Sequence, residues 1–364
     1  MPLEKKIKNI IRNSGPISIS NYMQISLSDP EHGYYRKKSP IGTRGDFITA
    51  PEISQIFGEL IATWLISCCQ SFKLDTELCL AELGPGRGTL MMDILRVFSK
   101  IESFNKSVEV RMIDINEQMI AEQKKKLSAY PDMNIEWKES IDDLPKKPLL
   151  LVCNEFFDAL PINQFVMTEK GWREKMINLD VDDNLSYSLS NDITPHTALI
   201  PKDITKDAPL DSIYEVSPAS ISIMKQVSSH INKYGGFAII IDYGYYGNCY
   251  KDTFQAIKDH KYHDVLDSPG LADLTAHVDF DYLSNIAKDE NLNVYSNTTQ
   301  GDFLKNMGIS IRGSLLSKNS EQKEKIDDDI HRLISSDEMG TLFKCLAITS
   351  KDIQQPFGFN YDQG

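Results

Sequence analysis

The stretch LLLVCNEFFDALPINQF, residues 149 to 165, begins as a buried strand and then places Asn154, Glu155 and Asp158 around two phenylalanines. An unpaired carboxylate is costly to bury, so such a cluster either lies at a hydrated strand end or receives a cationic partner. The three side chains are therefore candidate active-site residues, and other segments of the sequence are needed to identify their binding partner.

A glycine-rich segment, LCLAELGPGRGTLMMDIL, follows the pattern of a strand, a tight turn and a helix. Gly84, Gly86 and Gly88 let the backbone approach a ligand closely, although NAD sites, FAD sites and purely structural turns share such patterns. A dinucleotide fingerprint has its third glycine one residue later, and the carboxylate of Glu82 would repel a pyrophosphate. S-adenosylmethionine instead carries a sulfonium and an ammonium, which acidic groups attract. The segment therefore predicts a site for this cofactor.

A second acid, Asp114, stands at the end of the next predicted strand, in VEVRMIDINEQM. Its carboxylate can accept hydrogen bonds from both ribose hydroxyls of the cofactor. The alternative is an N-cap of the following helix, but Asn116 is itself a good cap. Glu139, Ser140 and Ile141, in EWKESIDDLP, follow a further strand and are predicted to close over the adenine. A polar loop without a ligand is the alternative for these three residues.

The segments LTAHVDF and IDYG carry further polar residues that could face the same site. His277, with Asp273 and Asp279, could orient a substrate or accept a proton, and we retain it as a candidate catalytic residue. The alternative is a histidine whose hydrogen bonds are satisfied within the fold. Asp242 and Tyr243 end a predicted strand, where polar residues often only cap.

The elements that must position these residues alternate along the chain. Apolar runs at 78–83, 108–115, 149–153 and 237–241 predict strands, and the first two are each followed by a stretch with helical periodicity. Such alternation is typical of a parallel, doubly wound sheet flanked by helices.

Other segments interrupt or extend this pattern. Residues 171–190 alternate like a hairpin, and residues 243–292 are predicted to be mostly irregular. Residues 341–350 predict a late strand, which follows a charged helical stretch at 320–334 that is most simply a solvated face. We expect the two interruptions to build a substrate-side subdomain.

The composition excludes several classes of protein. The chain has 364 residues, of which 41% are hydrophobic, and its net charge is −13, with 39 basic and 52 acidic residues. Because the sequence has only short basic runs, Lys124 to Lys126 being the one that stands out, nucleic acid is not an expected partner. Six cysteines without C-x-x-C spacing predict neither a metal site nor disulfides. No apolar stretch approaches a membrane span, and the first residues lack the apolar region of a signal peptide, so we expect a cytoplasmic protein.

Beyond the glycine turn, nearly the whole chain resembles the MidA-like S-adenosylmethionine-dependent methyltransferases, whose mitochondrial members are respiratory complex I assembly factors. Many separate blocks in the family's order make this resemblance more specific than the glycine turn alone. The blocks are HGYY (32–35), GDFITAPEISQIFGE (45–59), ELGPGRGT (82–89), NEFFDALPINQ (154–164), YEVSP (214–218), IDYG (241–244), DSPGLADLTAHVDF (267–280), TQGDFL (299–304) and MGTLFK (339–344). Two departures are mild: Asp114 stands where members often carry glutamate, and residues 309–338 match loosely.

The resemblance implies a class I, Rossmann-like α/β fold with a mostly parallel, seven-stranded sheet flanked by helices and an inserted substrate-side subdomain. We expect a helical and lid segment at 1–75, a methyltransferase domain at 76–350 and a C-terminal tail at 351–364. Insertions at about 163–210 and 243–292 would form the subdomain.

The resemblance also implies a role for the block GDFITAPEISQIFGE beyond capping the helix that follows it. Ser54 or Thr49 could cap that helix, but the block is rich in groups that could hydrogen-bond the cofactor's methionine moiety and a substrate. We therefore predict a lid, in which Thr49 contacts the cofactor and Asp46 belongs to the catalytic residues.

In a class I fold the fourth strand ends beside the transferable methyl group, and Asn154 and Glu155 occupy that strand end. Asn154 is assigned to both the cofactor and the catalytic residues. A planar guanidinium pairs with one carboxylate through two parallel hydrogen bonds, so Glu155 favours arginine as the methyl acceptor. Asp158 or Glu215 could supply a second carboxylate, and the sequence leaves this choice open. The alternative for Asp158 is turn or helix capping.

The predicted function is S-adenosylmethionine-dependent methylation of an arginine on a partner protein, a complex I subunit being the class that the resemblance implies. Two alternatives stay open: an assembly chaperone that keeps the cofactor without turnover, and a methyltransferase for another nitrogen or oxygen acceptor. The mitochondrial matrix replaces the cytoplasm if the protein is organellar.

Overall fold

A computed structural model describes residues 2–36, 48–70, 77–101, 107–318, 322–353 and 355–359. Contacts divide the chain into two compact units, which are described separately. The first unit draws on residues 1–47, 158–222 and 246–277, and the second on residues 48–157, 223–245 and 278–364. The segment expected at 1–75 is thus shared between the units, whereas the insertion expected at about 163–210 lies in the first.

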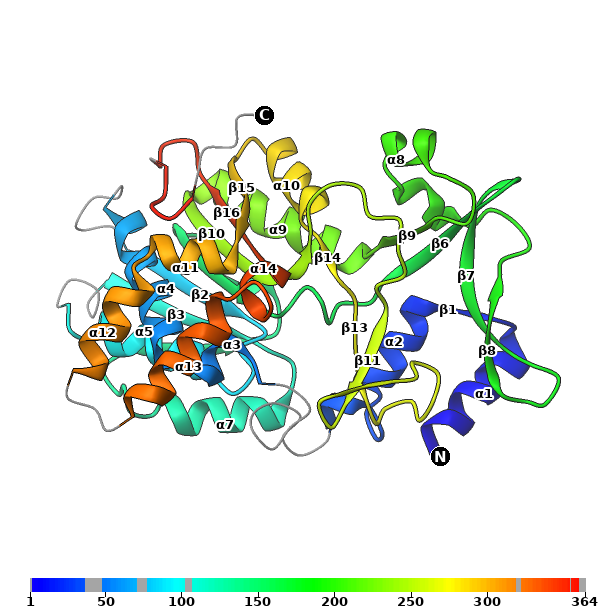
Figure 1. The fold of residues 1–364 in the computed structure, drawn as a ribbon, viewed down its shortest axis with the longest axis horizontal. Helices are drawn as coiled ribbons and strands as arrows, with labels where there is room; N and C mark the ends of the chain where they lie inside the picture. Colours follow the sequence, from blue (N-terminus) through cyan, green and yellow to red (C-terminus); the bar gives the residue numbers. More distant parts are fainter. Residues whose placement is uncertain are drawn as a thin grey trace. The chain divides into compact units, whose positions relative to one another are not determined.

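The second unit is built on a large sheet that runs in the order β15-β16-β10-β5-β2-β3-β4 (Figure 1). Neighbours from β10 to β4 pair in parallel, and β16 is antiparallel to both β10 and β15. The short β14 pairs with the end of β10. The strands are β2 (Leu78–Leu83), β3 (Val108–Ile113), β4 (Asn134–Lys138), β5 (Leu149–Asn154), β10 (Gly236–Tyr245), β14 (Val278–Asp279), β15 (Asn293–Thr299) and β16 (Phe343–Thr349).

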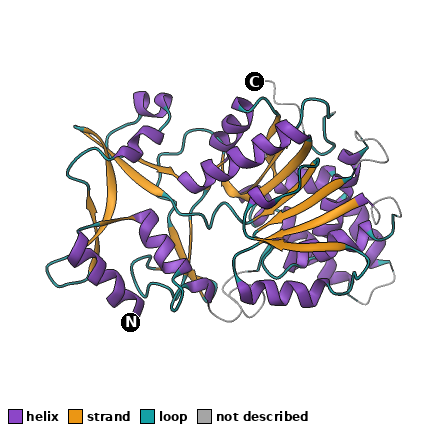
Figure 2. Cartoon of the chain, turned by 180° about the vertical axis from the view of Figure 1, so that it is seen from behind, coloured by secondary structure: helices purple, strands orange, loops and turns teal. Residues whose placement is uncertain are grey.

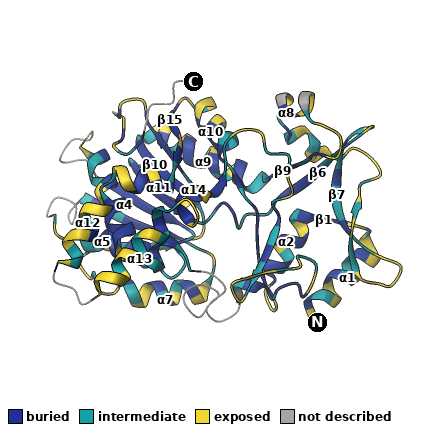
Figure 3. Cartoon of the chain, in the orientation of Figure 1, coloured by how far each residue is buried: buried dark blue, intermediate teal, exposed yellow. Residues whose placement is uncertain are grey.

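Helices flank this sheet (Figure 2), which is why every residue of β2 and β5 is buried. Figure 3 shows the central strands of this sheet in the colour of buried residues and much of the outer helices, α13 among them, in the colour of exposed residues. The helices are α3 (Ala50–Ile53), α4 (Gln55–Cys69), α5 (Thr89–Phe98), α7 (Glu117–Leu127), α9 (Pro218–Tyr234), α10 (Phe280–Asp289), α11 (Gln300–Asn306), α12 (Ile309–Ser317), α13 (Lys323–Ile334) and α14 (Met339–Leu342). The predicted α/β fold is confirmed, including the late strand near the C-terminus.

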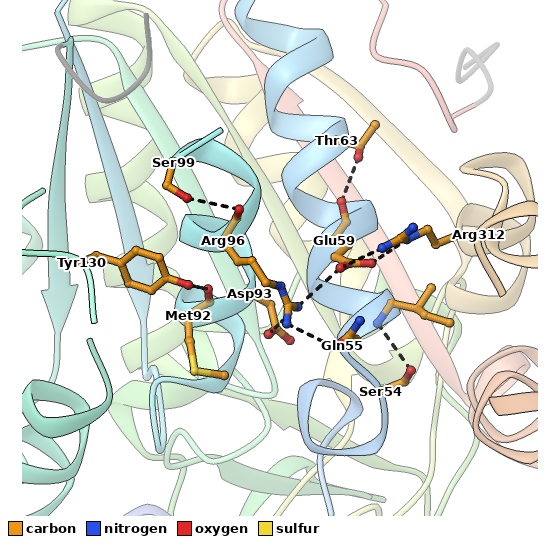
Figure 4. Close-up of polar contacts among 11 residues, drawn as sticks. Ser54, Gln55, Glu59, Thr63, Met92, Asp93, Arg96, Ser99, Tyr130 and Arg312 are labelled. Atoms are coloured by element: carbon orange, nitrogen blue, oxygen red, sulfur yellow. Dashed lines mark hydrogen bonds and ion pairs between the residues drawn. The ribbon is translucent and has the colours of Figure 1, made fainter. Parts of the chain in front are cut away.

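A partly buried charge network joins α4, α5 and α12 (Figure 4). Glu59 of α4 accepts hydrogen bonds from Nε and Nη2 of Arg312 on α12, at 2.7 and 3.2 Å. Arg96 of α5 donates to Asp93 at 2.8 Å and lies 3.6 Å from Glu59. Burial raises the pKa of Asp93 to about 7, although the charge of Arg96 opposes this shift. The network fastens α4 to the helix that follows the glycine turn.

The first unit contains two small sheets and two N-terminal helices. One sheet has the order β1-β7-β6-β9 with β8 paired to β7, and the other has the order β12-β11-β13. The elements are α1 (Pro2–Ser14), β1 (Ile17–Ser18), α2 (Ile19–Ser28), η1 (Tyr34–Arg36), β6 (Asn163–Thr168), β7 (Gly171–Leu179), β8 (Leu185–Leu189), η3 (Pro195–Leu199), α8 (Lys202–Asp207), β9 (Ile213–Val216), β11 (Gln255–Lys258), β12 (Lys261–His263) and β13 (Asp273–Thr275). The predicted hairpin is confirmed as β7 and β8.

The prediction that residues 243–292 are mostly irregular is wrong. This range contains β11 to β14, each of two to four residues, and the ten-residue helix α10. Such short strands leave little alternation to detect, whereas the buried positions Phe280, Leu283 and Ala287 of α10 carry a helical period that could have been found.

Two negative findings complete the fold. The six cysteines, which all lie within the described ranges, form no disulfide bond there. Within the described ranges, no helix is both long enough and apolar enough to cross a membrane.

Candidate active site

The glycine turn connects β2 to α5 in the second unit. Gly84, Gly86 and Gly88 have φ values of +59°, +50° and +73°, a region that residues with a Cβ rarely adopt. Space is also limited at Gly84, because an added Cβ would lie 2.6 Å from Cδ2 of Phe156. The turn therefore needs glycine at this position both for its backbone conformation and for its contact with the end of β5.

Glu82, the penultimate residue of β2, carries a carboxyl group and is only 3% exposed as a residue. It accepts a hydrogen bond from the backbone of Met91 in α5, but its Oε2 has no hydrogen-bond partner within the described ranges. Burial raises the pKa of Glu82 well above its ordinary value, and the charge of Asp114 adds to this effect. A buried acceptor of this kind could be satisfied by a cationic or hydrogen-bonding ligand.

Asp114 follows β3 and is tied to the glycine turn through Gln123. Oδ1 of Asp114 accepts from the Asn116 backbone at 2.8 Å, and Oδ2 accepts from Nε2 of Gln123 at 2.7 Å. The same Nε2 donates to the carbonyl of Gly86 at 2.7 Å, while Oε1 of Gln123 accepts from Trp137. Burial raises the pKa of Asp114. The N-cap of α7 is Asn116, so Asp114 is not needed for that role.

The loop predicted to cover the adenine follows β4. Ser140 caps the short helix η2 (Ile141–Asp143) by accepting from the Asp142 backbone at 3.2 Å. Ile141 is buried, whereas Glu139 is exposed. The cap and the buried isoleucine give this loop a defined shape.

The end of β5 forms a turn in which Glu155 has a φ of +50°. A left-handed glutamate is uncommon, and such conformations cluster at functional sites. Oε1 of Glu155 accepts hydrogen bonds from the Ala50 backbone at 3.2 Å and from Nδ2 of Asn154 at 3.1 Å. Oδ1 of Asn154 is buried and has no hydrogen-bond partner in the described part of the chain. The turn thus combines an oriented carboxylate with an unsatisfied amide oxygen.

Asp242 of β10 holds this turn from the neighbouring strand. Its fully buried Oδ2 accepts from the backbones of Phe156 and Phe157 at 3.1 and 2.9 Å, and Oδ1 accepts from Tyr243. The sequence offered two roles for this aspartate, a residue that faces the site or a strand-end cap, but not the hydrogen bonds to this turn. Its effect is to fix the two residues that directly follow Glu155.

The predicted lid is described from residue 48 onward, so Asp46 lies outside the described residues. Thr49 is the N-cap of α3, but its side chain makes no capping hydrogen bond. Ser54 caps α4 by accepting from Ile56 at 3.4 Å. Part of this block therefore has the capping role that the sequence left open.

Asp158 and His277 belong to the first unit. Asp158 is buried, and its backbone carbonyl accepts from Ala276. Burial raises the pKa of Tyr35, and the charge of Asp158 adds to this effect. The backbone of His277 donates to Oγ1 of Thr253 at 2.9 Å. Both residues thus lie near polar groups of their own unit.

Glu215, considered as a second carboxylate, also lies in the first unit. It accepts from Nε2 of Gln164 at 2.6 Å and from the backbone and hydroxyl of Thr253. Burial raises its pKa to about 7, although these hydrogen bonds oppose the shift. Its contacts are those expected of a buried structural acid.

A sequence family described as S-adenosyl-L-methionine-dependent methyltransferases matches residues 60–298. The chain belongs to this family. Methyltransferase relatives also match over almost the full length: the protein arginine methyltransferase NDUFAF7 homolog of Caenorhabditis elegans is 36% identical over 97% of this chain and 87% of its own. The human mitochondrial NDUFAF7 is 36% identical over 95% of this chain and 83% of its own.

A solved methyltransferase-family structure shows the same fold. This protein of Burkholderia thailandensis, bound to S-adenosyl-homocysteine, is 24% identical to the present methyltransferase. The match covers 98% of this chain and 94% of that chain, with a TM-score of 0.84. This likeness confirms the fold, and the family match with the two relatives confirms the family predicted from the sequence blocks.

Proposed function

We propose that this methyltransferase transfers a methyl group from S-adenosylmethionine to an arginine side chain of a partner protein. The observation that carries the proposal is the oriented carboxylate of Glu155 in a left-handed turn at the end of β5. A respiratory complex I subunit is the proposed partner class, because the resemblance noted in the sequence points to assembly factors of that complex.

The residues around the glycine turn fit the cofactor. The turn would admit the cofactor against its backbone, and Asp114 would accept hydrogen bonds from the ribose hydroxyls. The unsatisfied Oε2 of Glu82 and Oδ1 of Asn154 would serve the methionine end, directly or through water. Ser140 and Ile141 would border the adenine. The bound cofactor would supply an electrophilic methyl group on a positively charged sulfur.

The strand-end turn fits a guanidinium. Because Asn154 and Ala50 both donate to Oε1 of Glu155, the plane of the carboxylate is fixed before a substrate arrives. A fixed carboxylate can pair with two parallel N–H groups of arginine and hold one nitrogen in line with the methyl group. The ring of Phe156, which packs against Gly84, connects this strand-end turn to the glycine turn.

The transfer step is a single displacement. The guanidinium nitrogen forms a bond to the methyl carbon while the carbon–sulfur bond breaks, and the bonding electron pair stays with sulfur. The positive charge leaves sulfur, and the acceptor nitrogen then releases a proton to Glu155 or to water. Glu155 orients the nitrogen and stabilises the charge on the acceptor, so positioning supplies most of the rate enhancement.

The proposal is tested with purified protein, S-adenosylmethionine carrying a tritiated methyl group, and a lysate of the source cells. The labelled protein is isolated, hydrolysed to amino acids and compared with methylarginine standards. Label in methylarginine, absent when Glu155→Gln replaces the wild type, is expected. Label in another amino acid would overturn the arginine assignment, and cofactor binding without any label would favour the chaperone alternative.

A further inference from the structure

The short helix α3 lies between the glycine turn and the strand-end carboxylate in the network of contacts. It has four residues, of which Ala50 and Pro51 are buried. A single helical turn is not stable by itself, so its position must come from contacts with neighbouring elements. Those contacts run in two directions, to the start of α5 and to Glu155.

Glu52 makes the contacts to the start of α5. Its Oε1 accepts a hydrogen bond from Oγ1 of Thr89, the first residue of that helix, and lies 4.0 Å from Nζ of Lys126. Its Oε2 accepts from Nη1 of Arg87 at 3.5 Å. The side chain of Glu52 is only 15% exposed. Two hydrogen-bond donors, from the glycine turn and α5, and one ammonium group of α7 therefore converge on one carboxylate of α3.

Ala50 makes the contact to Glu155. It is the first residue of α3, and the first N–H groups of a helix have no partner within the helix. The Ala50 N–H donates to Oε1 of Glu155 at 3.2 Å. Because Ala50 and Glu52 share one helical turn, a shift of α3 would change the position of this donor.

We propose that Glu52 is a positioning residue for methyl transfer, which acts by holding α3 so that Ala50 fixes the carboxylate of Glu155. This inference rests on the proposed function of Glu155. It assigns a role to the lid block that differs from contact with a ligand. Through Glu52, helix α5, which begins at the glycine turn, sets the orientation of the carboxylate of Glu155.

Glu122 offers a matched control. It accepts from Nε of Arg87 at 3.3 Å but belongs to α7 and is 42% exposed. Glu52→Ala should lower kcat roughly tenfold to a hundredfold while cofactor affinity stays within about threefold, since displacement of a catalytic group by about 1 Å costs this much. Glu122→Ala should leave kcat unchanged. Glu52→Gln should restore part of the rate, because its amide oxygen can still accept from Thr89.

A double variant separates positioning from general damage. If Glu52 acts through Glu155, adding Glu52→Ala to Glu155→Gln should lower the residual rate no further. Independent, multiplicative losses would overturn the proposal, and so would a loss of cofactor affinity as large as the loss of kcat.

Hydrogen exchange tests the structural part without any substrate. The peptide that contains Ala50 should exchange faster in Glu52→Ala than in Glu122→Ala, and equal protection would overturn the proposal. If the wild type labels no arginine, the proposed function fails, while the exchange experiment still decides whether Glu52 holds α3.

Discussion

Replacing Glu155 by glutamine tests the acceptor site most directly, because the structure determines how the variant side chain must lie. Two donors, the Ala50 N–H and Nδ2 of Asn154, point at Oε1. The amide oxygen of the glutamine should occupy that position, since its NH₂ group would otherwise face two donors. The NH₂ group then replaces Oε2 and would face the N–H groups of an arginine.

The variant side chain therefore lacks the negative charge of Glu155, and its NH₂ group faces the N–H donors of the arginine. Losing one such pairing costs about 2 to 5 kcal/mol, or about one and a half to three and a half decades in rate. Folding should be little affected, because both donors at Oε1 keep an acceptor. Calorimetry should show nearly normal cofactor affinity, while transfer to an arginine-bearing partner falls by that factor. Glu117→Gln, at an exposed position of α7, is the control. Normal turnover in Glu155→Gln would refute the guanidinium pairing.

Three further predictions concern the glycine turn, the strand-end turn and the charge network. Gly84→Ala would place a methyl carbon 2.6 Å from the ring of Phe156 in a left-handed backbone, so calorimetry should show cofactor binding weakened roughly tenfold or more; unchanged affinity would contradict the close packing. In Asp242→Asn an NH₂ group replaces one of the two carboxylate oxygens that accept from backbone N–H groups. The free energy of unfolding measured in urea should therefore fall by about 1 to 3 kcal/mol, and wild-type stability would contradict this account. The folded pKa of Asp93, about 7, exceeds the unfolded value of about 3.9, so its contribution to stability is fully present below about pH 4 and is lost as the pH rises towards 7. Asp93→Asn should flatten that part of the unfolding free energy measured against pH, and an unchanged slope would show that Asp93 is not the titrating group.

The sequence predicted those features that depend on neighbouring residues. The glycine turn was recognisable because glycines follow an apolar run and precede a helical period. The partners of Asp242, the backbones of Phe156 and Phe157, could not be inferred, because they lie 86 and 85 residues away in the turn after another strand. Gln123 gave no signal either, since a single glutamine in a charged helix looks like a surface residue, yet it is fully buried between Asp114 and Gly86.

The backbone of Glu155 was equally hidden. Position 155 holds glutamate, which does not favour a positive φ, whereas glycine or asparagine at that position would have signalled one. The conformation arises from contacts that tertiary structure brings together, and the sequence could indicate only that a carboxylate stands at the strand end.

The pairing of Glu59 with Arg312 bears on how far the chain can be shortened. Residues 309–338 resemble the family loosely, which makes them an attractive segment to delete when a minimal enzyme is engineered. Glu59 is 9% exposed. If α12 were removed, its carboxylate would lose both hydrogen bonds from Arg312 and would keep the ion pair with Arg96 at 3.6 Å. Because Arg312 is 36% exposed and Arg96 stays close, this loss should cost less than the about 3 to 5 kcal/mol of a fully buried pair, but it would still remove part of the stability of an ordinary domain. A truncated enzyme would therefore need an apolar residue at position 59 before its activity could be judged.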